Sequence, residues 1–498
     1  MNILNIIRQT GIFSLGLCLS SFFASCEEEG SGWDISQVED DPEIPEEVTS
    51  NKKAPLYWTV YEYCFEAEHS GQSTNMPKGV WEENIKWVSE NLKPYGYNMI
   101  CTDGFMSMYT DMNVDDSGYM TNYGEYTLKE LVALCKQYGL KLGVYDNPLW
   151  IHGPLETKIE GTNIPFSNLL YDPAVDQVNH PNATGDIFTW VVASHKGAKE
   201  YIDGFFKYYK NLGVDFIRMD FMCLYETGGG MAEGDAGGRG YGRENYRLAL
   251  EYIKEAADKY GVFTSIVMPN CVNNAEYESQ YCDMFRVDAD TFNGTFDHVN
   301  GLSDSWFSIY GDATYYRRRG DVSNDKWPTC YNMFDGFVHW SSVSGRDKII
   351  LDGDFTRLAT LTNDAECEFA ISLQLLAGGP IAVADQYNSA NIDQRLRFYQ
   401  NEEMLALNTD KFVGKPLAID YWNAEGQIWY GQMSNGDYIV GLFNRENTPQ
   451  VRSLNLSQIG INQAMKARDL WRHQDEGEVT TISVTLEPHA CKVIKLSK

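Results

Sequence analysis

Short apolar segments alternate with amphipathic stretches over most of the chain, from Pro55 to about residue 410. The apolar segments are rich in β-branched and aromatic residues, which favours strands, and they lie at 57–63, 97–103, 141–147, 214–220, 262–268, 283–290, 347–353 and 380–385. Stretches with helical spacing and a final glycine lie between them, most clearly at 127–139, 199–213 and 245–261. Strands that alternate with helices predict an α/β fold, a (β/α)8 TIM barrel, over residues 55–408. A doubly wound open sheet is the main alternative, but no dinucleotide-type glycine fingerprint follows an early strand.

The pattern changes after about residue 408. The segments QIWYGQM (427–433), DYIVGLFN (437–444) and TTISVTL (480–486) read as short strands, and the helical spacing fades. An Asn-Gly turn at 434–437 predicts a hairpin between the first two. Residues 409–498 are therefore predicted to form a C-terminal antiparallel β-sandwich packed on the barrel. We expect it to stabilise the barrel, with sugar binding as the alternative.

The N-terminal residues predict export. Residues 1–26 contain Arg8, a short apolar run and the phrase Phe-Ala-Ser-Cys, which resembles a bacterial lipobox with Cys26 as the lipidated residue. The acids that follow resemble the export signal of surface lipoproteins in the Bacteroides group. Residues 27–54 are acidic and without apolar periodicity, which is typical of a disordered tether. We therefore expect a lipoprotein of the outer membrane; a plain secretory signal is the alternative.

The composition of the chain limits the kinds of binding partner that are expected. The 498 residues carry a formal net charge of −30, which argues against nucleic acid or an anionic membrane surface and leaves a neutral sugar open. The only membrane contact expected is through the lipid anchor. Nine cysteines follow Cys26 without a CxxC pair, so a zinc site is not expected. One or two disulfides are conceivable, but core positions are favoured for most of these cysteines.

Aspartates stand at the ends of five predicted strands. They are Asp103, Asp146, Asp220, the pair Asp288 and Asp290, and the pair Asp352 and Asp354. Functional groups of a (β/α)8 barrel gather at the carboxyl ends of its strands. A ring of carboxylates there suits a polyhydroxylated substrate, and cleavage of a glycosidic bond needs one ionised and one protonated carboxyl group. Each Asp alone could instead cap the next helix, but the repetition favours a site.

Several phrases, taken in their order and spacing, resemble glycoside hydrolase family 27, the α-galactosidase and α-N-acetylgalactosaminidase family. GLKLGVY (139–145), FIRMDFM (216–222) and FRVDAD (285–290) are similar to the family's phrases at strands three, four and six. SDSW (303–306) and LDGDF (351–355) are similar to the phrases that follow. The resemblance runs from the second strand to the C-terminus, and it implies a glycosidase. No cofactor or metal is expected.

The resemblance assigns the chemistry to two aspartates. Asp220 is expected to be the nucleophile that forms a glycosyl-enzyme ester, and Asp290 the acid/base, about 5–5.5 Å away in a retaining enzyme. Arg218 is expected to favour the ionised form of Asp220, and Arg286 to bind the 2-hydroxyl of the sugar. The substrate-binding set implied is Asp103, Tyr145, Arg218, Arg286 and Asp354. In the structural alternatives, Arg218 and Asp220 form only an ion pair at the rim, and Arg286 pairs with Asp288.

Two positions depart from the family. In CTDGFM (101–106), Asp103 keeps the first of two aspartates that grip the galactose 4- and 6-hydroxyls, and Gly104 stands at the second. Val267 stands where the family often has a sugar-binding Glu. The leading prediction is α-galactosidase-like hydrolysis of terminal α-linked sugars in oligo- or polysaccharides. The alternatives are the same mechanism on a β-L-arabinopyranoside or an α-1,6-glucan with isomaltose release, and a non-catalytic glycan-binding lipoprotein.

Two segments near the predicted site have no counterpart in the barrel pattern. The glycine-rich segment 226–244 follows the fourth strand and is interpreted as a mobile lid or wall, or alternatively as surface slack. The long insertion 152–190 carries His152 and several aromatic residues. It either extends the substrate groove or forms an extra subdomain on the rim.

Overall fold

The computed structural model describes residues 53–104, 112–180, 183, 185–228, 238–291, 293–301, 332–419 and 423–498. The predicted signal peptide with Cys26, nearly all of the predicted tether and the phrase SDSW lie outside these residues, so they stay predictions. Within the part of the chain that the structure describes, no helix is both long enough and apolar enough to cross a membrane.

One parallel sheet closes on itself. Its strand segments are β1 (Leu56–Thr59), β2 (Met99–Cys101), β5 (Lys141–Tyr145), β6 (Val214–Met219), β7 (Phe263–Ile266), β8 (Met284–Arg286), β9 (Ile350–Asp352), β10 (Phe355–Thr356) and β11 (Ile381–Val383). β11 pairs with both β1 and β10, and β9 pairs with β8. Because only Gly353 and Asp354 separate β9 from β10, these two segments are halves of one interrupted strand. The sheet is therefore the predicted (β/α)8 barrel, with a break in its seventh strand.

The break in the seventh strand places a carboxylate inside the barrel. Asp354 has a φ of 66°, in the left-handed region that residues other than glycine rarely adopt. Gly353 admits no side chain, because a Cβ there would lie 2.6 Å from Cγ of Met333. Asp354 is completely buried, so its charge must be met by partners within the barrel.

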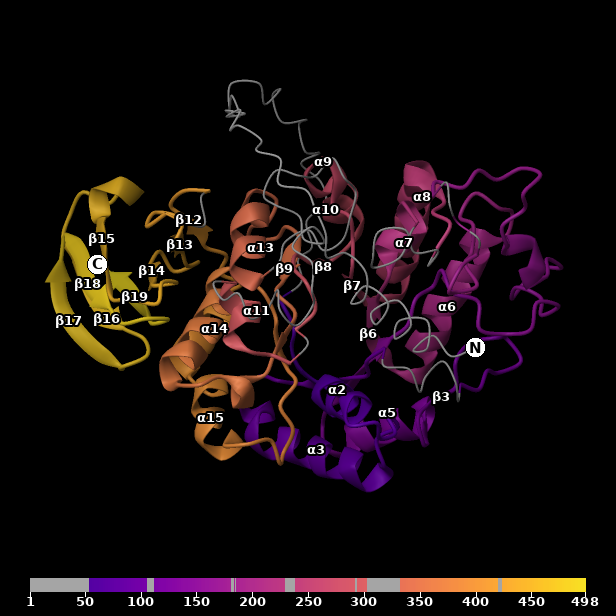
Figure 1. Ribbon diagram of the computed structural model, residues 1–498, viewed down its shortest axis with the longest axis horizontal. Coiled ribbons are helices and arrows are strands. Elements are labelled where there is room, and N and C mark those ends of the chain that lie inside the picture. The colour runs from indigo at the N-terminus through magenta and orange to yellow at the C-terminus, as the bar shows by residue number, and fades with distance from the viewer. Residues whose placement is uncertain are drawn as a thin grey trace, which may run out of the picture.

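Helices surround the barrel (Figure 1). They are α2 (Tyr61–His69), α3 (Lys78–Asn91), α5 (Leu128–Gln137), α6 (Ala198–Leu212), α7 (Met222–Glu226), α8 (Gly242–Tyr260), α9 (Val272–Ala275), α10 (Glu278–Tyr281), α11 (Phe296–Asn300), α13 (Met333–His339), α14 (Asp364–Leu376), α15 (Ile392–Tyr399) and α16 (Glu402–Thr409). The three predicted helices are confirmed as α5, α6 and α8. α5 begins at a capping box between Thr127 and Glu130, and α6 ends at Gly213 with a φ of 97°. A small hairpin, β3 (Asn122–Tyr123) and β4 (Tyr126–Thr127), precedes α5.

The first predicted strand is only partly correct. β1 ends at Thr59, and Tyr61 already begins α2, whereas the prediction continued the strand to residue 63. The aromatic residues of YWTVYEY favour a strand by propensity, but tertiary packing overrides that preference. Tyr61 and Phe65, one helical turn apart, stack at 5.9 Å between ring centroids, and both are buried against the barrel core.

The C-terminal residues form two antiparallel sheets. The larger sheet has the order β12-β13-β14-β19-β16-β17, and β15 pairs with β18 in the smaller one. Their bounds are β12 (Lys415–Pro416), β13 (Ile428–Gln432), β14 (Tyr438–Phe443), β15 (Gln450–Asn455), β16 (Met465–Asp469), β17 (Gln474–Val479), β18 (Thr481–Leu486) and β19 (Cys491–Ser497). Side chains from both sheets share one apolar core, including Val440, Leu454 and Ile482. This is the predicted β-sandwich, and the predicted hairpin connects β13 to β14.

The sandwich packs on the barrel through α14. This helix is buried from Glu366 to Leu376, and Figure 1 shows it between the barrel and the yellow strands. Trp471 of the sandwich donates a hydrogen bond from Nε1 to Oγ of Ser372, at 2.8 Å. Arg445 of the sandwich is buried and pairs with Asp335 of α13 at 2.8 Å. A buried ion pair and a partly buried aromatic side chain fix the two domains against each other.

The cysteines of the described residues are core residues, as the sequence favours. Eight of them are buried free thiols, namely Cys64, Cys101, Cys135, Cys223, Cys271, Cys282, Cys367 and Cys491. Burial raises the pKa of the Cys135 thiol to about 12, so the nucleophilic thiolate is scarce at neutral pH. These residues therefore fill the core rather than join loops.

Candidate active site

The acids at the strand ends separate into two groups by exposure. Asp146, Asp288, Asp352 and Asp354 are completely buried, and Asp103 is nearly so. Asp220, directly after β6, and Asp290, four residues after the end of β8, are partly exposed. The side chain of Asp290 keeps 29% of its exposure. The two predicted catalytic acids are thus the most exposed members of this ring.

Asp220 is held by three hydrogen bonds. Tyr145 donates from Oη to Oδ2 at 2.7 Å, and the backbone N–H of Phe221 donates to Oδ1 at 2.6 Å. Asn147 donates from Nδ2 to the backbone carbonyl of Asp220 at 2.9 Å. Phe221 has a φ of 60°, so the chain turns sharply after β6 and presents the carboxylate at the mouth of the barrel. Both oxygens of the carboxylate are therefore fixed in direction.

Burial raises the pKa of Asp220 to about 6, with a further rise from the negative charge of Asp290. The positive charge of Arg286 and the hydrogen bonds from Tyr145 and Phe221 act in the opposite direction. At neutral pH the carboxylate is mostly ionised, as a nucleophile must be. Asp290, which follows β8, therefore acts electrostatically on Asp220, which follows β6.

Arg286 connects the acids of the site. Its Nη2 lies 2.5 Å from Oδ1 of Asp290, and its Nη1 lies 3.3 Å from Oδ2 of Asp354. The alternative partner considered from the sequence, Asp288, instead lies 3.3 Å from Nε2 of His298. The contact fixes the position of the Asp290 carboxyl group beside Arg286. The predicted contact of Arg286 with a sugar 2-hydroxyl stays a prediction.

Arg218 does not have the role that the sequence suggested. It was expected to bind substrate and to favour the ionised form of Asp220, but its side chain is only 2% exposed. Its Nη1 binds Oδ2 of Asp352 at 2.9 Å, and its Nη2 binds Oδ1 of Asp354 at 2.8 Å. The reason is the left-handed Asp354, which turns a second carboxylate towards this guanidinium. Arg286 is the cation that most lowers the pKa of Asp220.

Asp354, also predicted to bind substrate, is a structural partner instead. Thr291 donates to its Oδ2 from both the backbone N–H and Oγ1, each at 2.8 Å. Burial alone would raise the pKa of Asp354, but the charges of Arg286 and Arg218 outweigh burial and lower it. Asp354 therefore stays ionised and holds Arg286 beside Asp290. The contacts form one continuous chain from Arg218 through Asp354 and Arg286 to the acid/base candidate.

Asp103, which follows β2, is nearly completely buried. Its Oδ1 accepts a hydrogen bond from the N–H of Gly104 at 2.8 Å, and its carbonyl accepts one from Tyr123 Oη at 2.6 Å. Burial raises the pKa of Asp103 to about 7, against the lowering effect of Arg218. Near neutral pH this carboxyl group can therefore both donate and accept a hydrogen bond. Both abilities suit the recognition of a hydroxyl group.

The space beside Gly104 is filled by Tyr145. A Cβ at residue 104 would lie 2.1 Å from Cζ and 2.4 Å from Oη of Tyr145, so a second aspartate is sterically excluded here. Tyr145 is nearly completely buried. Tyr145 was predicted only as a substrate contact, whereas its hydroxyl binds Asp220. Val267 is also buried, and its backbone N–H donates to the carbonyl of Met219 at 2.7 Å.

Sequence reasoning did not assign the supporting contacts of Asp146 and Asn147. Asp146 accepts hydrogen bonds from Tyr209 Oη at 2.5 Å and lies 2.7 Å from Nε2 of His152. Asp146 therefore forms its hydrogen bonds inside the protein, whereas the sequence predicted it as part of a ring of carboxylates at the mouth of the barrel. Asn147, next to it, is the residue that holds the backbone of Asp220. The only signal available was the polar pair Asp-Asn at the end of an apolar strand.

The insertion and the glycine-rich segment are joined at their bases. The backbone N–H groups of Asn179 and His180 donate to the carbonyl of Arg239 at 3.1 and 2.9 Å. Gly228 and Gly240 meet there, because a Cβ at Gly240 would lie 2.5 Å from the nitrogen of Gly228. Residues 229–237, the centre of the predicted lid, lie outside the described residues. The insertion, which follows β5, is therefore joined to the segment that follows β6.

Comparisons with known proteins agree with this geometry. Residues 423–496 match the family model of the α-galactosidase C-terminal β-sandwich domain. The isomalto-dextranase of Arthrobacter globiformis is 31% identical over 473 residues, which cover 90% of this chain and 68% of that protein. An α-galactosidase of Oryza sativa subsp. japonica is 26% identical over 199 residues, which cover 39% of this chain and 46% of that enzyme.

Solved structures give the same result for the fold. The isomalto-dextranase of Arthrobacter globiformis complexed with panose superposes with a TM-score of 0.77 at 31% identity, over 90% of this chain and 73% of that one. The β-L-arabinopyranosidase of Geobacillus stearothermophilus has a TM-score of 0.65 at 19% identity, over 90% of this chain and 97% of that one, and shows the fold alone. With a barrel, a sandwich and two reachable carboxyl groups in these positions, the chain belongs to glycoside hydrolase family 27 and is a glycosidase.

Proposed function

We propose that this glycosidase retains configuration, with Asp220 as nucleophile and Asp290 as acid/base. The observation that carries the proposal is that these two acids are the partly exposed members of the ring and that the charge of Asp290 acts on Asp220. A pair of carboxyl groups on either side of one anomeric carbon is what double displacement requires. Their predicted separation of about 5–5.5 Å stays part of the proposal.

The first step forms a bond between Oδ of Asp220 and the anomeric carbon, while the bond from that carbon to the leaving oxygen breaks. Asp290 gives its proton to that oxygen and becomes a carboxylate. Arg286, 2.5 Å away, stabilises the carboxylate as it forms. In the second step Asp290 takes a proton from water, whose oxygen attacks the anomeric carbon and releases Asp220. Two inversions at one carbon leave its configuration unchanged.

For the substrate, we propose an α-1,6-linked glucan rather than an α-galactoside. The support is the 31% identity to an isomalto-dextranase over 90% of the chain and the residues at two sugar-contact positions. At residue 104 the Tyr145 ring takes the place of a second carboxylate, and at residue 267 a buried Val replaces a possible acceptor. A site that lacks a partner for a hydroxyl loses its preference for the sugar that presents it.

A panel of substrates tests this specificity. We expect the protein to hydrolyse dextran and 4-nitrophenyl α-isomaltoside at least about 100-fold more efficiently, in kcat/KM, than 4-nitrophenyl α-galactoside and β-L-arabinopyranoside. Release of 4-nitrophenol and chromatography of the sugar products measure this directly. Turnover of the α-galactoside alone would contradict the glucan proposal and leave the mechanism standing. Binding without turnover of any member would favour the glycan-binding alternative.

The hydrogen bond from Tyr145 gives a prediction for pH dependence. This bond lowers the pKa of Asp220, so Tyr145→Phe should raise that pKa above about 6. Because the nucleophile must be ionised, activity is lost as the pH falls through this pKa. The acidic limb of the kcat/KM profile should therefore move up by about 0.5–1 pH unit, the equivalent of a hydrogen bond worth about 1 kcal/mol. An unchanged acidic limb would show that Tyr145 does not affect the pKa of the nucleophile.

For the location, we propose an exported lipoprotein anchored in the outer membrane through Cys26. The support is the lipobox-like phrase before Cys26 and the acidic residues after it. Expressed in a bacterium that processes lipoproteins, the full-length chain should incorporate labelled palmitate and sediment with membranes. Cys26→Ala should abolish both. Equal labelling of the two proteins, or a soluble unaltered chain, would instead favour the plain secretory signal.

A further inference from the structure

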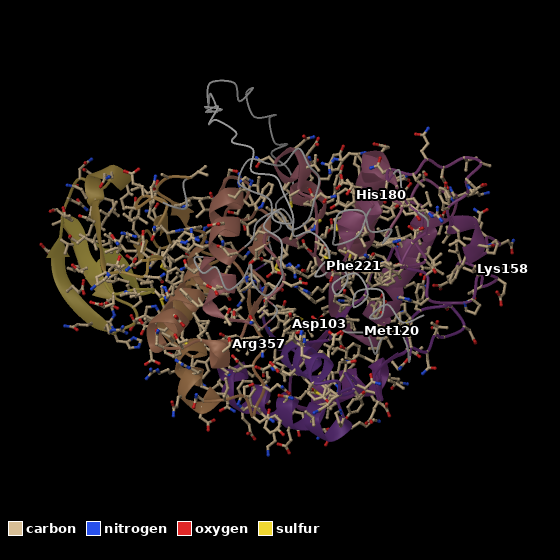
Figure 2. The ribbon with its side chains drawn as sticks, viewed as in Figure 1. Asp103, Met120, Lys158, His180, Phe221 and Arg357 are labelled. Carbon is tan, nitrogen blue, oxygen red and sulfur yellow. The ribbon has the colours of Figure 1, made fainter. Side chains whose placement is uncertain are left out.

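We propose that Arg445 of the C-terminal β-sandwich positions the acid/base candidate Asp290 on the barrel. Arg445 follows β14 and Asp290 follows β8, so the two residues belong to different domains. The helices α11 and α13 lie between β14 and β8 in Figure 1, and side chains fill this region in Figure 2. The inference rests on the proposed function, in which Asp290 transfers the proton, and it gives the sandwich a part in that transfer.

Arg445 joins α11 to α13. It is completely buried, and its Nη1 donates to Oδ1 of Asp335 in α13 at 2.8 Å. Its Nε donates to Oδ1 of Asn300, the last residue of α11, at 2.9 Å, and its Nη2 donates to the backbone carbonyl of Asn300. Asn300 donates back from Nδ2 to the carbonyl of Arg445 at 2.9 Å. Because the donors of a guanidinium point in fixed directions, these bonds hold the two helices in one arrangement.

The sandwich also holds the first residue of α11. The ring of Phe296 stacks on that of His489 in the sandwich, with 4.6 Å between centroids and 29° between planes. Nδ1 of His489 lies 3.0 Å from Oε1 of Glu366 in α14, which fixes the imidazole in turn. Both ends of the short helix α11 therefore rest on sandwich residues.

α11 contacts the residues next to Asp290 through His298. Nε2 of His298 lies 3.2 Å from the backbone carbonyl of Ala289 and 3.3 Å from Oδ2 of Asp288. A carbonyl oxygen only accepts hydrogen bonds, so Nε2 of His298 carries the hydrogen in this contact. All three residues are buried. His298 therefore fixes the backbone of the residue immediately before Asp290.

α13 contacts the same segment with its backbone. Gly336 follows Asp335, and a Cβ at Gly336 would lie 2.6 Å from Cγ2 and 2.9 Å from the carbonyl oxygen of Val287. On its other side, the N–H of Val287 donates to the carbonyl of Asp352 at 3.0 Å. Val287 is thus confined between α13 and the seventh strand. Since packed interiors transmit displacements, the position of α13 sets that of the segment that leads to Asp290.

This arrangement acts on one of the two catalytic acids. Asp220 takes its hydrogen bonds from Tyr145, Asn147 and the N–H of Phe221, which all belong to the barrel. A general acid must lie within hydrogen-bond distance of the leaving oxygen, and a misplacement of about 1 Å can lower a rate by about 100-fold. A change at Arg445 should therefore affect proton transfer by Asp290 more than attack by Asp220.

The test compares two substrates with the same glycosyl unit, chosen from the substrate panel. One has a sugar as its leaving group, and the other has 2,4-dinitrophenolate, which leaves without a proton. In Arg445→Lys the ammonium group can pair with Asp335, but it lacks the fork that binds Asn300 at the same time. We expect kcat/KM to fall by about 10–100-fold for the sugar leaving group and by less than about threefold for dinitrophenolate. A smaller folded fraction would lower both values equally, so their ratio reports on proton transfer.

Arg468→Lys is the matched control. Arg468 makes another ion pair between the sandwich and the barrel, with both carboxylate oxygens of Glu403 in α16 at 2.8 Å. Because α16 follows β11 and not β8, the same substitution there should leave the ratio unchanged. Asn300→Ala is a second test variant, which keeps the pair of Arg445 with Asp335. It should lower the ratio in the same direction as Arg445→Lys.

His298 allows a rescue experiment at the other end of this path. His298→Leu removes the donor to Ala289 and should lower the ratio by at least about tenfold. His298→Gln provides an amide N–H at about the reach of Nε2 and should restore most of the ratio. A side chain that served only to fill space would not distinguish the two leaving groups.

The reference for all of these variants is Asp290→Asn. If its losses depend on the leaving group and the ratio is unchanged in Arg445→Lys, or in Asn300→Ala should Arg445→Lys not fold, the inference alone is wrong. An equal fall of the ratio in Arg468→Lys would also overturn it, because the effect would then come from any loosening between the domains. Equal losses for both leaving groups in Asp290→Asn would overturn the acid/base assignment and this inference with it.

Discussion

Asp220→Asn is expected to abolish turnover and leave the barrel folded. Asn has nearly the same shape as Asp, so Tyr145 Oη still has an acceptor, but the neutral amide is a poor nucleophile. We expect kcat to fall by about 10⁴-fold or more, because the covalent route is closed and only residual electrostatic and binding effects remain. Steady-state kinetics on the substrate that the panel identifies, followed over days, measures a loss of this size.

The same substitution should not destabilise the protein at neutral pH. Burial raises the pKa of Asp220 to about 6, above the value of about 3.9 for an exposed Asp. The folded state therefore disfavours the charged form, and stability is lost as the pH rises from about 4 through about 6. Removing the charge removes this penalty, so the free energy of unfolding of Asp220→Asn at pH 7 should equal or exceed that of the unaltered protein. Urea unfolding at pH 4 and pH 7 checks the sign.

Asp215→Asn is a matched control on the same strand. Asp215 belongs to β6 and pairs with Lys210 and Lys141 at the protein surface, so its variant should keep full activity. Asp220→Ala gives a second check, since azide can enter the space left by the carboxylate and attack the anomeric carbon. The product should be a glycosyl azide of inverted configuration. Near-normal turnover by Asp220→Asn would show that Asp220 is not the nucleophile.

The architecture could be predicted from the sequence, and the two acids proposed as catalytic could be singled out, because their signals are local. An apolar run that ends in Asp220, and an Arg four residues before Asp290, are visible within single segments. The alternation of strands and helices is equally visible, because each element carries its own periodicity. Even the hairpin in the sandwich follows from the four residues at 434–437. A feature that depends only on the residues of one short segment can therefore be predicted from a single sequence.

The roles of Arg218 and Asp354 could not be predicted because they depend on residues far apart in the chain. The pairing joins positions separated by 136 residues, and it needs Asp354 to adopt a left-handed conformation that its residue type does not announce. The phrase LDGDF gave only the glycine as a hint that the seventh strand is interrupted. Because the strand breaks there, the carboxylate of Asp354 turns inward and pairs with both Arg218 and Arg286.

The same limit applies to Gly104 and Tyr145. Each position was singled out separately, one as a missing carboxylate and the other as a sugar contact. Their mutual exclusion appears only when β2 and β5 pair side by side, which brings the Tyr145 ring into the space that a Cβ at residue 104 would need. A glycine in a strand end thus marks the close approach of another side chain, but not which one.

Asp290→Asn is expected to slow the enzyme by an amount that depends on the leaving group. For a sugar leaving group, loss of the proton donor should lower kcat/KM by about 10²–10⁴-fold. For a 2,4-dinitrophenyl glycoside the loss should be less than about tenfold, because that phenolate leaves without a proton. The second step still lacks its base, so the glycosyl-enzyme ester on Asp220 should accumulate, and mass spectrometry of the intact protein would detect it.

The pH profile of this variant tests the coupling between the two acids. The charge of Asp290 contributes to the raised pKa of Asp220, and Asn carries no charge. With the dinitrophenyl substrate, the acidic limb of kcat/KM should therefore move from about pH 6 to a lower pH, the opposite direction to that expected for Tyr145→Phe. An equal loss of kcat/KM for both leaving groups would show that Asp290 does not donate the proton. An acidic limb that moves to higher pH would mean that Arg286, once it has lost its partner Asp290, no longer lowers the pKa of Asp220. The direction of the shift therefore decides whether Asp290 or Arg286 has the larger effect on the pKa of the nucleophile.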